Sequence, residues 1–496
     1  MDYQQTFEQI KSQFGSTCDL RTIELSIGGI ESCFMFIDGY IDTLLFEENI
    51  LKPLKNLSKT DMITLELLNK YTMMTTPVKE ITDINQAVDL ISSGEMILLA
   101  DKSPCLFMYS EKKYQMRAVA EPPVSTVLRG PREGFVEDIK INMFLIRKRL
   151  ASPKLTFELL NVGKYTKTKI AVCFLDGVAE QKIVDKIKKQ ISSINIDGII
   201  ESSYIARYLE ENKLSLFSQV GSSEKPDIIV GKMLEGRVAI IVDGSPSVLT
   251  LPFILYENFQ MSEDYYIKSY RASMIRCVRL FAVIFSILLP AIYVALQEHQ
   301  YQLFPLKFLL SSLGSIYAIP LSPTLEMLLI MTIFEILNET SIRMPRYVSM
   351  ALSVVGAIVL GEAAVSAGLF SISSVIIVAV STVGIYCVPD EINSSNILRF
   401  VFVGIAGVLG LVGVILALVA LIGYMCSINS YGTSFMAPYA PSIIHDWQDG
   451  VIKAQIEEFE ERPLSLPTKN RTRQRPTHKD GKAGKDNSKS NKKPKK

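Results

Sequence analysis

The chain has 496 residues, of which 48% are hydrophobic, and its formal net charge at pH 7 is +1. The near-zero charge lacks the basic excess by which proteins bind nucleic acid, so we expect no nucleic-acid partner. The seven cysteines show no C-x-x-C spacing and the three histidines lie in no recognisable motif, so we expect no metal and no cofactor. The polar start MDYQQTFEQI is not a signal peptide, and internal helices would have to drive any membrane insertion.

Residues 1–125 predict an α/β subdomain that begins with a polar helix or arm at 1–20. Short apolar runs that end in turn residues predict strands, and apolar residues at helical spacing predict helices. The expected strands are Ser32–Asp38, Met96–Ala100 and a hairpin of Leu106–Tyr109 with Tyr114–Val119, and the expected helices are Thr43–Leu57 and Asn85–Ile91.

Residues 155–268 repeat this pattern and predict a second, related subdomain. A strand at Lys169–Leu175 precedes an amphipathic helix at Ala179–Ile194, and the segment Gly236–Asp243 resembles Gly94–Asp101. The alternative is chance similarity between short apolar segments.

Four aspartates follow predicted strands in this α/β region, at positions 38, 101, 176 and 243. Strand ends often carry ligands in α/β proteins, but Asp and Gly are also ordinary turn residues, and we favour the turn interpretation. Since the sequence also has no Gly-rich phosphate loop and no paired-carboxylate motif, we expect that the protein is not an enzyme.

Residues 126–154 predict a helical connector whose helix covers Phe135–Leu150. Arg129, Arg132 and Glu133 lie just before this helix, among two glycines and a proline. Such a rigid charged loop would bind an anion or clamp a neighbouring subunit; the alternative is a solvated linker.

Residues 269–446 predict an all-α transmembrane domain. Phe400–Cys426 carries no charged residue, and as a helix it would extend roughly 40 Å, more than the ~30 Å of a bilayer's hydrocarbon core. The other predicted spans are Leu280–Gln297, Tyr347–Ser366 and Ser371–Val388.

Thr324–Asn338 is helical in pattern but carries Glu326 and Glu335 on opposite sides. A charge at mid-bilayer costs about 2.5–3.5 kcal/mol on insertion scales. This helix would therefore lie at the interface, re-enter the membrane or pack inside an assembly.

The span Tyr347–Ser366 has a single charge, Glu362, among small residues that permit close helix packing. Two interpretations are open: Glu362 lines a pathway shared by several copies of the chain, or it is a neutral, hydrogen-bonded core carboxyl. The candidate residues for pore lining or helix packing are Gly356, Gly361, Glu362, Ala364 and Gly368.

The residues from 447 to the end predict a basic cytoplasmic tail, disordered from about 462 and able to contact anionic lipid. If the tail and the α/β region lie on the same side, the number of crossings is even. Four spans satisfy this rule, although Arg343, Arg346 and Arg399 would then face outward.

Several motifs together resemble the A subunit of bacterial spore germinant receptors. They are Val127–Glu137 with Asn142 and Arg147, Glu224–Asp227, Leu234–Pro246, Pro323 with Glu326, Phe334-Glu335, Ile342-Arg343 with Pro345, Gly356–Val365 and Ser434–Tyr439. The sequence departs from the family at Asn338–Ser341, where an Arg-Glu-Ala-Gly run is usual. The resemblance makes the charged residues Arg129, Arg132, Glu133, Glu326, Glu335 and Arg343 candidates for inter-subunit or structural contacts.

The resemblance implies a receptor subunit in the spore inner membrane that acts with a transporter-like B subunit and a lipoprotein C subunit. Such receptors sense nutrients and trigger ion release, with the nutrient pocket mostly in the B subunit. We therefore expect a homo-oligomeric ion channel that responds to germinant indirectly; the alternatives are a secondary transporter subunit and a membrane scaffold with no pore of its own.

Overall fold

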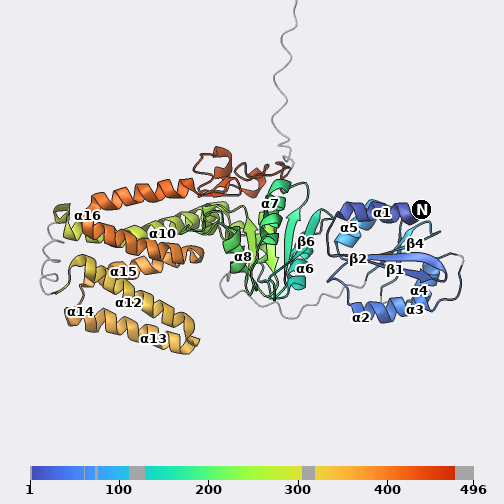
Figure 1. Cartoon of the computed structure of the whole chain (residues 1–496), viewed down its shortest axis with the longest axis horizontal. Coiled ribbons are helices and arrows are strands. Elements are labelled where there is room, and N and C mark those ends of the chain that lie inside the picture. The colour runs from blue at the N-terminus through green and yellow to red at the C-terminus, as the bar shows by residue number, and fades with distance from the viewer. Residues whose placement is uncertain (1–2, 61, 73–75, 111–128, 304–318, 475–496) are drawn as a thin grey trace, which may run out of the picture.

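The computed structural model describes residues 3–60, 62–72, 76–110, 129–303 and 319–474. The predicted strand Tyr114–Val119 lies outside the described residues. Two α/β subdomains and a helical domain follow one another along the long axis of the molecule (Figure 1). The predicted fold class is confirmed.

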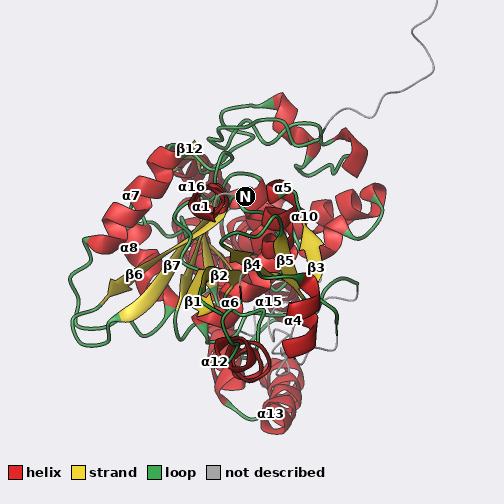
Figure 2. Cartoon of the chain, turned by 90° about the vertical axis from the view of Figure 1, so that its right-hand side faces the viewer, coloured by secondary structure: helices red, strands yellow, loops and turns green. Residues whose placement is uncertain are grey.

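The first subdomain is a five-stranded antiparallel sheet in the order β1-β2-β4-β5-β3, with helices on both faces (Figure 2). Because both faces are covered, β4 is buried at every position and its sequence MILLA does not alternate. The elements are α1 (Tyr3–Phe14), β1 (Leu20–Ile27), β2 (Ile30–Ile37), α2 (Thr43–Phe46), a π-helical turn (Glu47–Leu51), α3 (Lys52–Lys55), α4 (Leu65–Tyr71), β3 (Lys79–Ile81), α5 (Ile84–Ser92), β4 (Met96–Ala100) and β5 (Leu106–Tyr109).

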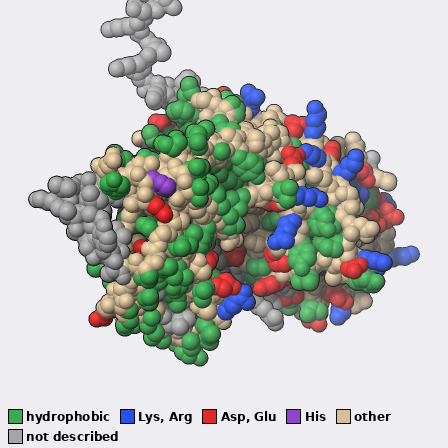
Figure 3. Space-filling view, turned by 60° about the vertical axis from the view of Figure 1, so that its left-hand side comes forward, with side chains coloured by type: hydrophobic (Ala, Val, Ile, Leu, Met, Phe, Trp, Pro, Cys, Tyr) green, Lys and Arg blue, Asp and Glu red, His purple; other side chains and the backbone are tan. Residues whose placement is uncertain are grey.

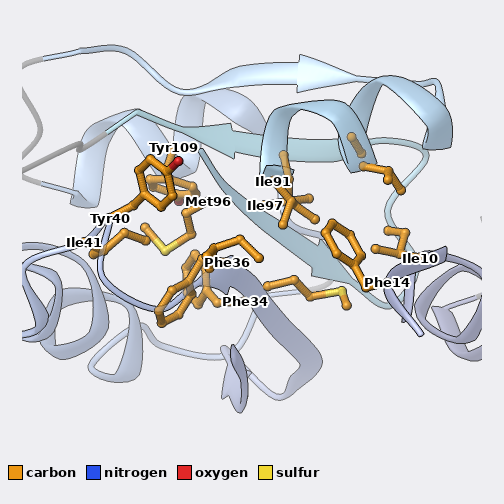
Figure 4. Packing of buried hydrophobic residues seen from close by; sticks show 14 of the residues in the cluster. Ile10, Phe14, Phe34, Phe36, Tyr40, Ile41, Ile91, Met96, Ile97 and Tyr109 are labelled. Carbon is orange, nitrogen blue, oxygen red and sulfur yellow. The ribbon is translucent and has the colours of Figure 1, made fainter. Parts of the chain in front are cut away.

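The core of this subdomain has two sides. On one side, Ile10 and Phe14 of α1 lie near Ile91 of α5 and Ile97 of β4 (Figure 4). On the other side, Phe34 of β2 meets the ring of Phe46 edge-on at 5.2 Å. The polar helix expected at 1–20 is therefore an amphipathic covering helix.

The second subdomain has the same strand order, β6-β7-β9-β10-β8, and is also wholly antiparallel. This shared topology confirms the prediction of two related subdomains. Its elements are α6 (Ile139–Arg149), β6 (Leu155–Val162), β7 (Thr168–Leu175), α7 (Gln181–Ser192), α8 (Ser202–Leu209), β8 (Gly221–Ser223), α9 (Pro226–Leu234), β9 (Val238–Val242) and β10 (Val248–Leu251).

Helix α6 differs from its predicted role as a separate connector. It packs against α9, β7 and β9, so it covers the second sheet and opens the second repeat as α1 opens the first. Asp243, one of the four strand-end aspartates, accepts a hydrogen bond from the Ile139 amide at the start of α6 (3.3 Å). This supports the turn and capping interpretation of Asp243.

A buried ion pair joins the two subdomains. The fully buried Arg147 guanidinium donates from Nε to Asp19 Oδ2 and from Nη2 to Asp19 Oδ1, both at 2.9 Å. It also donates to the carbonyl oxygens of Ser152 (2.7 Å) and Leu155 (2.9 Å). The Cys18 amide, next to Asp19, donates to the Phe157 carbonyl at 3.0 Å, so β1 and β6 begin side by side.

The helical domain consists of α10 (Ser269–Glu298), α12 (Pro323–Arg343), α13 (Arg346–Ile358), a π-helical turn (Val359–Ala363), α14 (Ala364–Ser366), α15 (Ile372–Ile385) and α16 (Ile392–Ser427). Among the described residues, three helices are long and apolar enough to cross a membrane: Ser269–Glu298, Tyr347–Ser366 and Pro389–Ser427. The fourth predicted span is only the 14-residue α15. Apolar side chains cover much of the helical half of the surface, whereas charged ones gather on the α/β half (Figure 3).

Arg399 is buried between α15 and α16 and donates to the hydroxyls of Ser381 (3.1 Å) and Thr382 (3.0 Å). The side of the membrane on which the four-span count places it stays a prediction. Helix α16 begins eight residues before the predicted span at Phe400, and this extension places Arg399 inside the bundle.

The chain after α16 returns to the second subdomain. Tyr431 donates to the Leu209 carbonyl (3.1 Å), and Phe435 packs between Phe217 and Phe253. Arg462 is buried and donates to the Leu234 carbonyl at 2.6 Å. Residues 462–474 are thus packed against the α/β region, which differs from the predicted start of disorder at 462; residues 475–496 lie outside the described part.

Replacement of Arg147 by Met should destabilise the joint between the subdomains by about 3–5 kcal/mol, because Asp19 would be left buried and uncompensated. Hydrogen exchange of the β1 and β6 amides in the full-length protein would measure this effect. The control is Arg207→Met, at an exposed arginine on α8. Equal exchange in both variants would contradict the assigned role of Arg147.

Candidate functional site

The outermost helix of the helical domain, α13, carries the residues predicted to line a pore or pack helices. It packs against α12, and a Cβ atom at Gly356 would lie 3.0 Å from Leu337 of α12. Its other side is open, with Met350 70% exposed and Ile358 57% exposed. Gly356 is therefore a packing residue, and the apolar face opposite it has no cover within this chain's described residues.

Glu362 lies in the π-helical turn Val359–Ala363, which continues α13. Its side chain is exposed, as is the neighbouring Gly361. Turns of this kind inside α-helices are frequent at functional sites. Glu362 is therefore not buried within one copy of the chain, and both interpretations of this residue stay predictions about the assembly.

The two remaining candidates on this segment end the helix. Ala364 is partly buried against the core of the helical domain. Gly368 has a φ of +67°, and the Leu369 amide after it donates to the Ala364 carbonyl at 3.0 Å. A glycine in this left-handed conformation is the common way to terminate a helix.

Glu326 and Glu335 point into the helical domain and connect its helices. Glu326 is buried and accepts a hydrogen bond from the Ser371 amide at the start of α15 (2.6 Å). Glu335 accepts from Asn396 Nδ2 of α16 (3.1 Å), and Asn396 Oδ1 in turn accepts from Arg399 (3.3 Å). These contacts assign a structural role within one chain to both glutamates.

Arg343 is exposed at the end of α12 and pairs with Glu339 on the same helix (Nε to Oε1, 2.8 Å). Pairs of this spacing on a helix surface contribute about 0.3–0.5 kcal/mol. The Arg343 side chain is 76% exposed, so a neighbouring subunit can reach it.

The charged loop before α6 is fixed to the second subdomain and is not a free linker. Glu133 accepts from Lys148 Nζ and Arg149 Nη2, both at 2.8 Å. The Phe135 amide donates to the Glu224 carbonyl (2.8 Å), and a Cβ at Gly130 would meet the Tyr266 ring. The side chains of Arg129 and Arg132 are exposed on this loop.

A buried ion network at the base of α10 was missed by the sequence analysis. Arg279 donates to both carboxylate oxygens of Asp264, at 2.7 Å and 3.0 Å. Arg276 donates to Asp264 Oδ2 (3.1 Å) and to Asp449 Oδ1 (2.9 Å). The only sign of it in the sequence is the basic composition of Tyr270–Arg279, which is also ordinary beside a membrane span.

We call Asp264, Arg276, Arg279 and Asp449 the junction network. An aromatic residue, Tyr265, contacts two of its members. The Tyr265 hydroxyl donates to Asp449 Oδ2 at 2.7 Å, and the Arg276 guanidinium lies 5.4 Å from the Tyr265 ring centroid. Burial, and next the negative charge of Asp449, raise the pKa of Tyr265 well above its ordinary value. The hydroxyl therefore remains a donor at every physiological pH.

Helix α16 contains a break at Gly410 that the uncharged segment Phe400–Cys426 does not predict. Gly410 has φ +61° and ψ −154°, a conformation that is essentially restricted to glycine. His299 Nε2 bonds the Gly407 carbonyl (2.8 Å), and Gln300 Oε1 accepts from the Leu411 amide (3.2 Å). The end of α10 thus satisfies the backbone groups that the break exposes, as a hydrocarbon surrounding requires.

The open face of α13, the Glu362 turn and the junction network offer packing surfaces and charged side chains. Among the described residues, no group of three or more His, Cys, Asp or Glu side chains is placed to hold a metal ion. What the arrangement offers is an open helix with one carboxylate and a rigid link from the α/β region to the membrane helices.

The charged loop predicts a pH effect. Partial burial raises the pKa of Glu133, but hydrogen bonding to Lys148 and the nearby charges of Lys148 and Arg149 outweigh it, so the pKa is lowered overall. A lowered folded-state pKa adds stability above the ordinary value of 4.5, and this contribution is lost as the pH falls through the lowered value.

The Glu133→Gln variant should therefore show a smaller loss of melting temperature between pH 5 and pH 3 than the parent protein, in full-length protein followed by thermal unfolding. Glu137→Gln, at a nearby exposed glutamate, is the control and should retain the parental pH dependence. The same acid slope in parent and Glu133→Gln would contradict the assignment.

Comparison with known proteins places these features in a family. The family described as "Bacillus/Clostridium GerA spore germination protein" matches residues 8–465. "Spore germination protein KA" of Bacillus subtilis (strain 168) is 31% identical over 94% of this chain and 87% of its own length. "Spore germination protein GerLA" of Bacillus cereus is 30% identical over 94% and 96%, respectively.

Two further similarities concern the membrane and the α/β region. The "Uncharacterized membrane protein YfkQ" of Bacillus subtilis (strain 168) is 30% identical over 88% of this chain and 85% of its own length. The solved N-terminal domain of the A subunit of the Bacillus megaterium spore germinant receptor GerK3 is 26% identical and covers 50% of this chain and 92% of that chain, with a TM-score of 0.40. The family match over residues 8–465 and these relatives show that the chain belongs to the GerA spore germination protein family, and its three candidate spans make it a membrane protein.

Proposed function

We propose that this receptor subunit, which like its family is not an enzyme, forms an oligomeric ion-conducting channel in which α13 and the Glu362 turn line the pathway. The observation that carries the proposal is the open, apolar face of α13 with one exposed carboxylate at its end. A lipid-facing glutamate would cost about 2.5–3.5 kcal/mol at mid-bilayer. Copies of the chain arranged around a water-filled pathway would remove that cost and cover the apolar face.

The expected setting is a complex in the inner membrane of the spore. In it the chain acts with a B-type transporter-like subunit and a C-type lipoprotein subunit and responds to nutrient germinant indirectly. Arg129, Arg132 and Arg343, all exposed, are the candidates for contacts between subunits.

The orientation that we infer has the α/β region and the C-terminal segment on the cytoplasmic side. Their contact, through Tyr431 with Leu209 and Arg462 with Leu234, supports a shared side of the membrane. A shared side requires an even number of crossings. One shorter helix, α12 or α15, would then cross the membrane in addition to the three long apolar helices. The basic residues of the tail favour the cytoplasmic side of the membrane.

The test is single-channel recording on the purified full-length protein in planar bilayers, after its oligomeric state has been measured in detergent. Discrete cation-selective openings from an oligomer are the expected result. A silent monomer, and silence again when the B and C subunits are added, would point to a scaffold with no pore of its own.

Glu362→Gln should lower the cation preference of these openings by roughly tenfold, since a ring of carboxylates concentrates counter-ions by that factor or more. The protein should still accumulate in membranes, because the side chain is exposed in one copy. Glu66→Gln, at an exposed glutamate of α4 in the first subdomain, is the control. Unchanged selectivity in Glu362→Gln would exclude the residue as a selectivity element.

A further inference from the structure

A polar cavity of about 550 Å³ lies between the second subdomain and the base of the helical domain. Its walls come from β8 and α9, from the segment around Tyr265 and Tyr266, and from Asp390 just before α16. The volume is within the range of about 300–1,000 Å³ that is usual for small-molecule sites. Asp227 and Arg237 lie in two motifs of the family resemblance, Glu224–Asp227 and Leu234–Pro246, but nothing in those motifs predicted a cavity.

Charged side chains of both signs line this cavity. The buried carboxylate of Glu257 pairs with Lys232 Nζ (2.7 Å) and with Arg237 Nη2 (3.0 Å). Arg237 Nη1 lies a further 3.4 Å from Glu235 Oε2. These pairs fix the positions of the charges around the cavity and leave little freedom for their side chains to move.

Three buried polar atoms of the lining have no hydrogen-bond partner among the described residues: Arg237 Nε, Asp227 Oδ1 and Glu257 Oε2. Glu257 Oε2 is nevertheless ion-paired with Lys232 Nζ, so Arg237 Nε and Asp227 Oδ1 are the two atoms open to a ligand. The Arg237 side chain is 4% exposed and that of Asp227 is 7% exposed. The other Asp227 oxygen accepts from the Tyr266 hydroxyl at 2.7 Å and lies 3.9 Å from the ammonium of the buried Lys225. An unsatisfied buried group costs about 1–3 kcal/mol, and more when it is charged. The cavity therefore presents one charged donor and one charged acceptor to whatever fills it.

We propose that this cavity binds a small zwitterion, whose ammonium group bonds Asp227 and whose carboxylate bonds Arg237. A ligand with both groups satisfies the two buried atoms at once, whereas a simple anion or cation satisfies one of them. The site is independent of the channel proposal, because binding can be measured without any current.

The position of the cavity implies a role in coupling. Tyr266 follows Tyr265 of the junction network, and its ring also contacts Gly130 of the charged loop. Asp390 stands at the entrance to α16. A ligand held here contacts the α/β region and the start of a membrane helix together, and so it stabilises their present arrangement.

Gly231 of α9 provides the sharpest test. It lines the cavity, and a Cβ atom at this position would meet no atom within 4 Å. Gly231→Met would place a long side chain in the open space at the cavity wall and occupy part of the cavity, whereas Gly231→Ala adds only a methyl group. Both replacements also favour the helix, since glycine is a poor helix former.

The experiment is isothermal titration of the full-length protein in detergent with ω-amino acids from glycine to aminohexanoate, in which the spacing of the two charges increases stepwise. Acetate and methylammonium, each with one of the two charges, are the ligand controls. At least one ω-amino acid should bind and raise the melting temperature, and both effects should disappear in Gly231→Met and be reduced less in Gly231→Ala.

Asp227→Asn keeps the shape of the side chain and should weaken binding by roughly 10- to 100-fold, whereas Asp197→Asn, at an exposed aspartate of the same subdomain, should not change it. This pair decides the question if Gly231→Met does not fold. No binding by any ω-amino acid, equal binding by acetate alone, or binding unchanged in Asp227→Asn would each overturn the proposal and leave a water-filled cavity.

Discussion

Two arginines near the start of the first membrane helix hold the molecule together, since they bind aspartates that lie far apart in the chain. Asp264 comes from the end of the α/β region and Asp449 from the segment after the last membrane helix. A buried guanidinium without such partners would cost several kcal/mol, so the three segments are stable only together. The orientation of the soluble region on the membrane domain follows from this one cluster.

The two α/β subdomains share one topology but make different contacts with the rest of the chain. In the first repeat the opening helix α1 only covers one face of its own sheet. In the second repeat the opening helix α6 also carries Arg147, which pairs with Asp19 of the first repeat. The second repeat also receives the C-terminal segment and the charged loop. It is thus the part of the soluble region through which a signal would have to pass to reach the membrane helices.

In the membrane domain, some charged residues bind neighbouring helices, whereas another is exposed on the outer helix. Glu326, Glu335 and Arg399 have partners inside the bundle, and these charges stabilise the packing of α12, α15 and α16. Glu362 lies instead on the outer helix, in a turn with altered helical geometry. Because the partners of the first three come from other helices, spacing along one helix could not distinguish them from Glu362.

The fold class, the repeated strands and helices, the long apolar helices and the family could all be predicted from the sequence, because apolar periodicity, uncharged length and motif composition are local properties. The sequence could not predict that α6 belongs to the second repeat, that Arg399 is buried or that residues 462–474 are packed, since these depend on contacts between distant segments. The junction network and the cavity at Arg237 also depend on such contacts, since their members lie far apart in the chain, as do Arg276 and Asp449, which are 173 positions apart. Charges so far apart in a sequence carry no mark of their partners, and it is their burial on folding that forces them to pair.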